Sequence, residues 1–146
     1  MGDSFSKITA ILLAAVLMFI IPIFYMREEA ERLSQTRIIE EVTFFVDGVR
    51  NTGILSREDY SRLEKVLYHL GGGYRIEMSH YSHILDENGE NVLYNETANY
   101  EEQIMECFQE QKDYYLKKYD YLKIVIKDNE DKVVAWYGGS VKYEAY

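Results

Sequence analysis

The chain has 146 residues, a net charge of −9 and a single cysteine, Cys107. So acidic a composition offers no basic face for phosphate groups, which excludes nucleic acid as an expected partner. One cysteine excludes an intramolecular disulfide and a cysteine-rich metal cage. The length is enough for one compact domain in addition to a terminal helix.

Residues 8–26 form an apolar run in which Tyr25 carries the only ionisable side chain. As a helix this run would be about 28 Å long, which is close to the thickness of the hydrocarbon core of a bilayer. A buried core helix is more often amphipathic, and a signal peptide needs small residues at a cleavage site, which the segment from Pro22 onward does not offer. We therefore expect a single-pass transmembrane helix in the lipid bilayer, bent at Pro22.

The sequence thus predicts two parts, namely residues 1–26, a short N-terminus with the anchor, and residues 27–146, a stem helix with a head domain. Lys7 precedes the apolar run, whereas Arg27, Arg32 and Arg37 follow it, so the count of positive charges alone slightly favours a cytoplasmic head. Long domains can nevertheless cross the membrane regardless of charge. We expect a protein of the cell membrane with a short cytoplasmic N-terminus and an extracytoplasmic head.

The chain is expected to remain helical from residue 27 to about residue 50. Apolar residues recur there at helical spacing and form one stripe, made up of Leu33, Ile38, Val42, Phe45, Val46 and Val49. Ser56 and Asp59 form an S-x-x-D variant of the capping box, which predicts the start of a second helix. The glycines at 71–73 predict its end.

A β-rich region with one further helix is expected after the glycines. Residues 74–85 alternate in polarity as a strand does, with Ile76 and Met78 on one face, and Asn88-Gly89 predicts a hairpin turn to a return strand at 92–94. The remaining expected elements are a helix at 100–117 capped by Asn99, a strand at 119–127, and a strand at 132–137 that bends or ends at Gly138-Gly139. Together these elements predict an α+β fold with one small antiparallel sheet.

Residues that could carry chemistry are few. His80 and His83 lie three apart in a predicted strand, which would place their side chains on opposite faces, and the usual spacings of zinc ligands are absent. The acidic turn at 86–90 does not fit a calcium loop, and the glycines at 71–73 do not fit a phosphate-binding loop. Cys107 has no identifiable base beside it. We therefore expect no enzyme activity, no metal and no cofactor.

Two groups of residues are typical of association. Ala10 and Ala14 form a small-x-x-x-small pair, and Ala15 adds a third small residue, so another helix could approach this side of the anchor closely. Tyrosines gather late in the chain, and those that we select as a possible interface are Tyr119, Tyr121, Tyr137, Tyr143 and Tyr146. Tyrosine suits protein interfaces, but it also covers small sheets, and both interpretations remain open.

Three stretches carry a family resemblance: VTFFVDGVRNTG at 42–53, the helix that contains Tyr60, and YDYLKIVIK at 119–127. Together with the anchor that continues into an amphipathic helix, they resemble type IV pilin-like subunits. More narrowly, they are similar to the minor pseudopilin-like proteins found with Tad-type secretion or pilus systems of Gram-positive bacteria. The sequence departs from the pilin pattern because its apolar segment contains no glutamate and no glycine-phenylalanine cleavage site precedes it.

The resemblance implies a structural subunit of an envelope-spanning assembly. Its partners would be other pilin-like or secretion-system subunits, in a homo- or hetero-oligomer that forms through the N-terminal helix and the head. The alternative is a membrane-tethered module whose tyrosine-rich head binds a partner protein.

Overall fold

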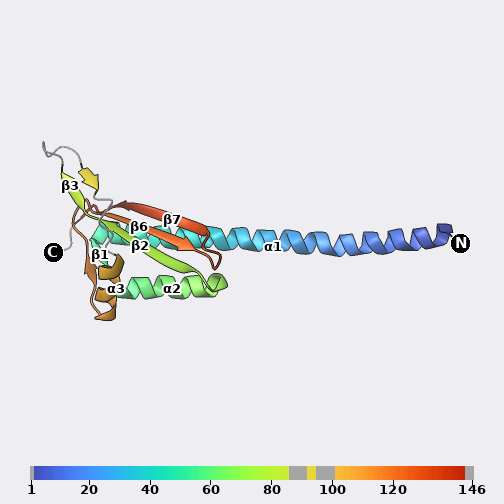
Figure 1. Ribbon diagram of the computed structural model, residues 1–146, viewed down its shortest axis with the longest axis horizontal. Helices are drawn as coiled ribbons and strands as arrows, with labels where there is room; N and C mark the ends of the chain where they lie inside the picture. Colours follow the sequence, from blue (N-terminus) through green and yellow to red (C-terminus); the bar gives the residue numbers. More distant parts are fainter. Residues whose placement is uncertain (1, 86–91, 95–100, 144–146) are drawn as a thin grey trace. The chain divides into compact units, whose positions relative to one another are not determined.

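The computed structural model describes residues 2–85, 92–94 and 101–143 (Figure 1). The helices are α1 (Gly2–Thr52), α2 (Arg57–Gly71) and α3 (Glu101–Gln109). The strands are β1 (Ile54–Leu55), β2 (Arg75–Tyr81), β3 (His83–Leu85), β4 (Val92–Tyr94), β5 (Tyr114–Tyr115), β6 (Tyr121–Lys127) and β7 (Val133–Ser140). The fold is therefore α+β, with one long N-terminal helix, as expected from the sequence.

The chain divides into two compact units, Met1–Ser34 and Gln35–Tyr146. Helix α1 continues through this division, and the boundary expected after residue 26 stays a prediction. We call the second unit the head.

The core of the head lies between the helices and one face of the central sheet. From α1, five residues of the expected stripe are buried, namely Ile38, Val42, Phe45, Val46 and Val49. They join Leu63 and Leu67 of α2 and the inward-facing residues of the strands in one apolar cluster. Leu33, the first member of the expected stripe, is exposed and belongs to the other unit. The amphipathic pattern thus becomes a buried face only within the head.

The ends of α2 follow the local chemistry of the sequence. Ser56 is the N-cap residue, and its side chain accepts a hydrogen bond from the backbone N–H of Glu58. At the other end, Gly72 has a φ of 62° and its N–H donates to the carbonyl of Tyr68. Glycine is favoured at that backbone angle because it carries no Cβ.

The central sheet has the strand order β2-β6-β7, and all its neighbours are antiparallel. Its inner face includes Met78 of β2 and Leu122, Ile124 and Ile126 of β6, all of which are fully buried. The alternation expected for residues 74–85 is confirmed within β2, and the strand expected at 119–127 is confirmed from Tyr121 onward. Strand β7 extends through Gly138 and Gly139 to Ser140, so those glycines do not end it.

The expectation of one sheet was wrong. Strand β2 pairs with the distant β6, while β3 and β4 form a separate pair in which His83 lies opposite Tyr94. Strands β1 and β5 form a third small sheet. The hairpin partner at 92–94 is confirmed, and its predicted turn at 86–90 lies outside the described residues.

The helix predicted at 100–117 was too long, since α3 ends at Gln109. Gln111 has a φ of 60°, which is incompatible with a continuing right-handed helix, and Tyr114 and Tyr115 then pair with β1. Leu116 is buried, and it reaches the core from the segment after β5. The expected cap residue, Asn99, lies outside the described residues.

Shortening a core side chain at the sheet centre should destabilise the head strongly. Ile124→Ala removes a fully buried side chain, and we expect it to lower the free energy of unfolding by about 2–5 kcal/mol. Ile39→Ala is the matched control, because Ile39 is 48% exposed. Urea unfolding of the full chain in detergent micelles, followed by near-ultraviolet circular dichroism, measures both; equal losses would contradict this description of the core.

Candidate functional site

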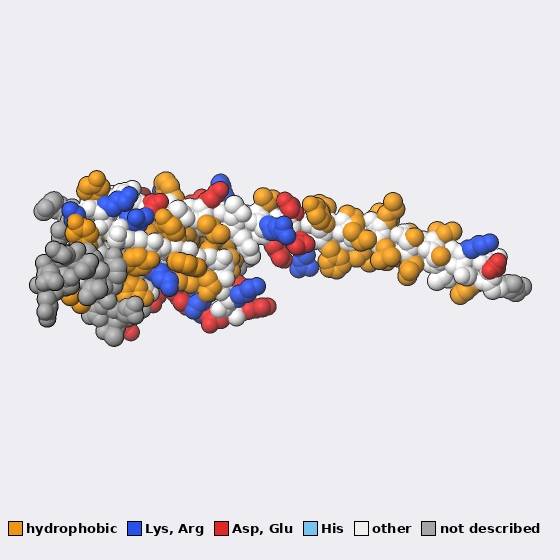
Figure 2. Space-filling model, turned by 90° about the horizontal axis from the view of Figure 1, so that it is seen from above, with side chains coloured by type: hydrophobic (Ala, Val, Ile, Leu, Met, Phe, Trp, Pro, Cys, Tyr) orange, Lys and Arg blue, Asp and Glu red, His pale blue; other side chains and the backbone are white. Residues whose placement is uncertain are grey.

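The first half of α1 presents an apolar surface that nothing in the structure covers. It contains an 18-residue window with a mean hydropathy of 2.6, of which 0% is buried. Figure 2 shows hydrophobic side chains along both the upper and the lower side of this part of the helix, with charged groups at either end. Fully burying one large apolar side chain stabilises by about 1.5–3 kcal/mol, so leaving this whole window in water would cost tens of kcal/mol. The helix is long and apolar enough to span a membrane.

The expected assembly residues Ala10, Ala14, Ala15 and Pro22 all lie within α1 and are exposed. Ala10 and Ala14 are one helical turn apart, so they lie on the same side of the helix. The helix continues through Pro22. Whether another helix packs against the alanines stays a prediction.

The tyrosines selected as a possible interface do not form one set. Tyr119 and Tyr143 are exposed, whereas Tyr121 and Tyr137 are half-buried. The hydroxyl of Tyr137 donates to Asp47, and its ring packs against the apolar core, so this residue connects β7 to α1. Tyr146 lies outside the described residues.

A buried polar cluster that the sequence analysis missed connects β2, β3 and β6. Its centre is Asp120, which is only 2% exposed and directly precedes β6. The carboxylate lies 3.0 Å from the Nε2 atom of His80 and 3.0 Å from the Nδ1 atom of His83. It also accepts hydrogen bonds from the backbone N–H groups of His83 and Lys117. Each of the two carboxylate oxygens therefore has two hydrogen-bond partners.

The expectation that His80 and His83 face opposite ways was wrong. The pairing of β2 ends at Tyr81, and residue 82 belongs to no strand, so the alternation of side chains is interrupted between the two histidines. Asp120 has the same parity as Leu122, Ile124 and Ile126, so it lies on the buried side of the segment that leads into β6.

These hydrogen bonds determine the electrostatics of the cluster. Burial alone raises the pKa of Asp120, but the hydrogen bonds from His80, His83 and two backbone amides outweigh it and hold the pKa well below its usual range. The ionised carboxylate can only accept, so Nε2 of His80 carries the proton that it donates. The other ring nitrogen of His80, Nδ1, lies 2.9 Å from the Tyr114 hydroxyl. The cluster thus connects segments that are distant in the sequence.

A groove of about 920 Å³ runs between α2 and β2. Its lining includes Tyr60, Leu67, Tyr74, Ile76 and Met105. Burial raises the pKa of Tyr60 to about 12, together with the neighbouring carboxylate of Glu64, which accepts a hydrogen bond from the Tyr60 hydroxyl. Tyr60 is therefore a neutral hydrogen-bond donor and not a base at physiological pH.

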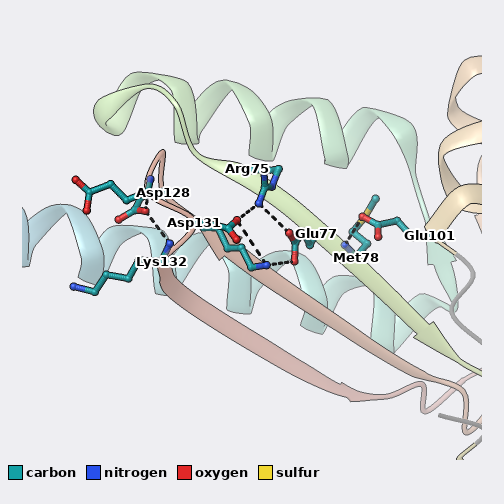
Figure 3. Close-up of polar contacts among 9 residues, drawn as sticks. Arg75, Glu77, Met78, Glu101, Asp128, Asp131 and Lys132 are labelled. Carbon is teal, nitrogen blue, oxygen red and sulfur yellow. Dashed lines mark hydrogen bonds and ion pairs between the residues drawn. The ribbon is translucent and has the colours of Figure 1, made fainter. Parts of the chain in front are cut away.

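Ion pairs occupy the sheet beside this groove. Arg75 lies in contact with Asp131 and 3.3 Å from Glu77, and Lys127 lies 2.8 Å from Glu77 (Figure 3). These charged groups neutralise one another across β2, β6 and the β6–β7 turn. Within the described residues, no group of three or more histidine, cysteine, aspartate or glutamate side chains has an arrangement suited to a metal ion.

Comparison of the chain with protein-family models, with curated proteins and with solved structures gave no match. Function is therefore inferred from the exposed apolar surface of α1 and from the surface of the head.

The cluster around Asp120 should make the stability of the head depend on pH in the acid range. The folded pKa of Asp120 lies below its unfolded value of about 3.9, so its contribution is complete above that value and is lost as pH falls through the folded pKa. Asp120→Asn should lower the free energy of unfolding at pH 7 by roughly 1–3 kcal/mol and should flatten its decline below about pH 4.

Urea unfolding of both forms between pH 7 and pH 2.5 measures this effect. Asp128→Asn is the matched control, because Asp128 forms hydrogen bonds within an exposed turn. If the wild-type chain and Asp120→Asn lost stability in parallel as pH fell, the buried carboxylate would not be the source of the pH dependence.

Proposed function

We propose that the protein is a membrane-anchored structural subunit of the pilin-like type, which associates with other subunits of an envelope-spanning pilus or secretion assembly. The observation that carries this proposal is that one helix provides both the exposed apolar surface and a buried wall of the head core. A separate tether would need only a flexible connection to its head. Here a single helix contains both the apolar window and residues of the head core, which supports a structural role for that helix.

The apolar part of α1 supports an anchor for a second reason. A core helix of a soluble domain buries its apolar residues, but here the apolar window has no buried residue. A bilayer or the helices of neighbouring subunits would provide the environment that the head does not. The proposed place is the cell membrane, with the head outside the cytoplasm.

The described part of the head supports a structural role more than a catalytic one. Its buried polar cluster has its hydrogen-bonding groups directed at one another, and the ion pairs near the groove are mutually satisfied. The second candidate function is a membrane-tethered binding module. What favours it is the exposure of the Tyr119 and Tyr143 side chains, together with the groove between α2 and β2.

The two candidates differ in what the anchor does. If the anchor packs against other subunits, replacing Ala10 and Ala14 with leucine should preserve insertion and head folding but should reduce co-purification with partner subunits, because bulkier side chains prevent close helix approach. Ile11→Leu with Ile20→Leu is the matched control, since it alters apolar residues and leaves the small ones in place. Quantitative pull-down from mild detergent measures the difference.

A photo-crosslinker at Ala14 provides a second readout for the same prediction. Capture of a neighbouring membrane helix is expected. Normal co-purification of the leucine variant, together with capture of lipid alone, would identify the anchor as a passive tether and favour the binding module.

The orientation is tested separately. Protease added to intact, wall-stripped cells should digest residues 27–146 and leave the N-terminal segment protected. Immunoblotting with one epitope tag at each end distinguishes the fragments. A head that stays intact until the membrane is permeabilised would reverse the orientation and remove the basis of the pilin-like proposal.

A further inference from the structure

We propose that the free edge of β7 is a docking site for an extended, acidic strand of another protein. Strand β7 is the last strand of the central sheet, and β6 is its only partner among the described strands. An exposed sheet edge presents unpaired N–H and C=O groups that can pair with a further strand.

The register shows which residues point to the free edge. Met78 gives its backbone N–H to Glu101 of α3, outside the sheet, so the neighbouring residue Glu77 is the one that bonds to Val125 of β6 (Figure 3). The backbone N–H and C=O of Val125 therefore point to β2. Its other neighbour, Trp136 of β7, must point its own N–H and C=O away from β6.

A second contact agrees with this alternation. Ser140 is four residues from Trp136, so its backbone N–H and C=O point to the same side of the strand as those of Trp136. Its carbonyl accepts a hydrogen bond from the side chain of Arg50. Its carbonyl therefore does not point to β6. Between these two residues, Gly138 has the same direction, so the backbone groups of Trp136 and Gly138 face outward at the edge of the sheet.

The two edges of the sheet are protected very differently. On β2, the carboxylate of Glu101 occupies the outward N–H of Met78, and the ion pairs of Arg75 and Glu77 lie on the same strand. On β7, no charged residue occurs from Val133 to Val141. Arg50 occupies the carbonyl of Ser140 at one end, and the pairing is irregular between Ile126 and Lys127 at the other, so the open stretch is the one around Trp136 and Gly138. Trp136 is 61% exposed and Val133 is 47% exposed. Soluble proteins usually protect such an edge with lysine, proline or a covering element, so an uncharged and exposed one indicates an interface.

The charges around the edge indicate the chemistry of the incoming strand. Lys132 precedes β7, Lys142 follows it, and Lys123 lies with its Nζ atom 5.7 Å from the centre of the Trp136 ring. Within the described part of the chain, none of these three lysines forms an ion pair. Of the three carboxylates in the β6–β7 turn, Asp128 binds backbone amides of its turn and Asp131 contacts Arg75, whereas Glu130 is exposed. A strand with apolar residues facing Trp136 and carboxylates near its ends therefore complements this edge.

A second copy of the chain is a poorer occupant. Two β7 edges related by a two-fold axis can pair only antiparallel, which would bring Lys132 of one copy close to Lys142 of the other. Like charges placed opposite each other across a strand pair are destabilising.

Trp136 is the only tryptophan in the chain, so its fluorescence reports directly on the edge. The probe is the peptide acetyl-Glu-Thr-Val-Thr-Val-Thr-Glu-amide, titrated into the full chain in zwitterionic detergent micelles. We expect a saturable change in fluorescence, at least about tenfold weaker binding when both glutamates are replaced by lysine, and no binding when the central threonine is replaced by proline. Amide hydrogen exchange should show new protection at Trp136 and Gly138.

Matched variants locate the effect. Lys132→Glu should weaken binding of the acidic peptide several-fold, while Lys65→Glu, the same charge change on α2, should leave it unchanged. Equal affinity for the acidic and basic peptides, protection at Ile76 of β2 in place of Trp136, or no saturable binding would each overturn the proposal. A fluorescence change on dilution of the chain without peptide would identify a second copy as the occupant and would overturn the proposal.

Discussion

The central constraint on this molecule is that α1 must satisfy two different environments. Its first half exposes apolar side chains in every direction, and its second half buries one stripe against a small domain. An amphipathic helix can meet the second requirement through packing alone. The first requirement is not met within the structure, because 0% of the apolar window is buried. The helix is long and apolar enough to cross a membrane, and its buried residues all belong to the head.

The head has one small apolar core. A three-stranded sheet, two shorter helices and the end of α1 enclose a single apolar cluster. Because the sheet is small, the segment that leads into β6 needs additional fixation. Asp120 provides it by accepting hydrogen bonds from side chains and backbone groups of three separate segments. A buried carboxylate without those donors would destabilise the fold, so the cluster forms as a unit.

Much of this architecture could be predicted from sequence periodicity. The stripe from Ile38 to Val49, the cap at Ser56 and the alternation of β6 are local patterns, and each is present in the structure. The pairing of β2 with β6 could not be predicted in this way, because it joins segments about forty residues apart and leaves no local signature. A hairpin signal at Asn88-Gly89 instead favoured a single local sheet.

The cluster of His80, His83 and Asp120 could not be predicted from the sequence for a related reason. Strict alternation separates the histidines, and only the interruption at residue 82 brings both to one carboxylate. The early end of α3 similarly depends on the backbone of Gln111 and on the pairing of β5 with β1. A useful signal was nevertheless present, since an isolated aspartate at the start of a strongly apolar strand requires several donors if it is buried.

The central claim is that the anchor and head belong to an assembly. The most direct measurement is the sedimentation of the full chain after extraction from its native membrane in mild detergent, with the protein mass separated from the bound detergent. The account predicts that the chain sediments as part of a complex much larger than one subunit, which breaks down in harsh detergent while the head stays folded. A chain that sediments as a single subunit in one micelle, under conditions that preserve other membrane complexes, would contradict it.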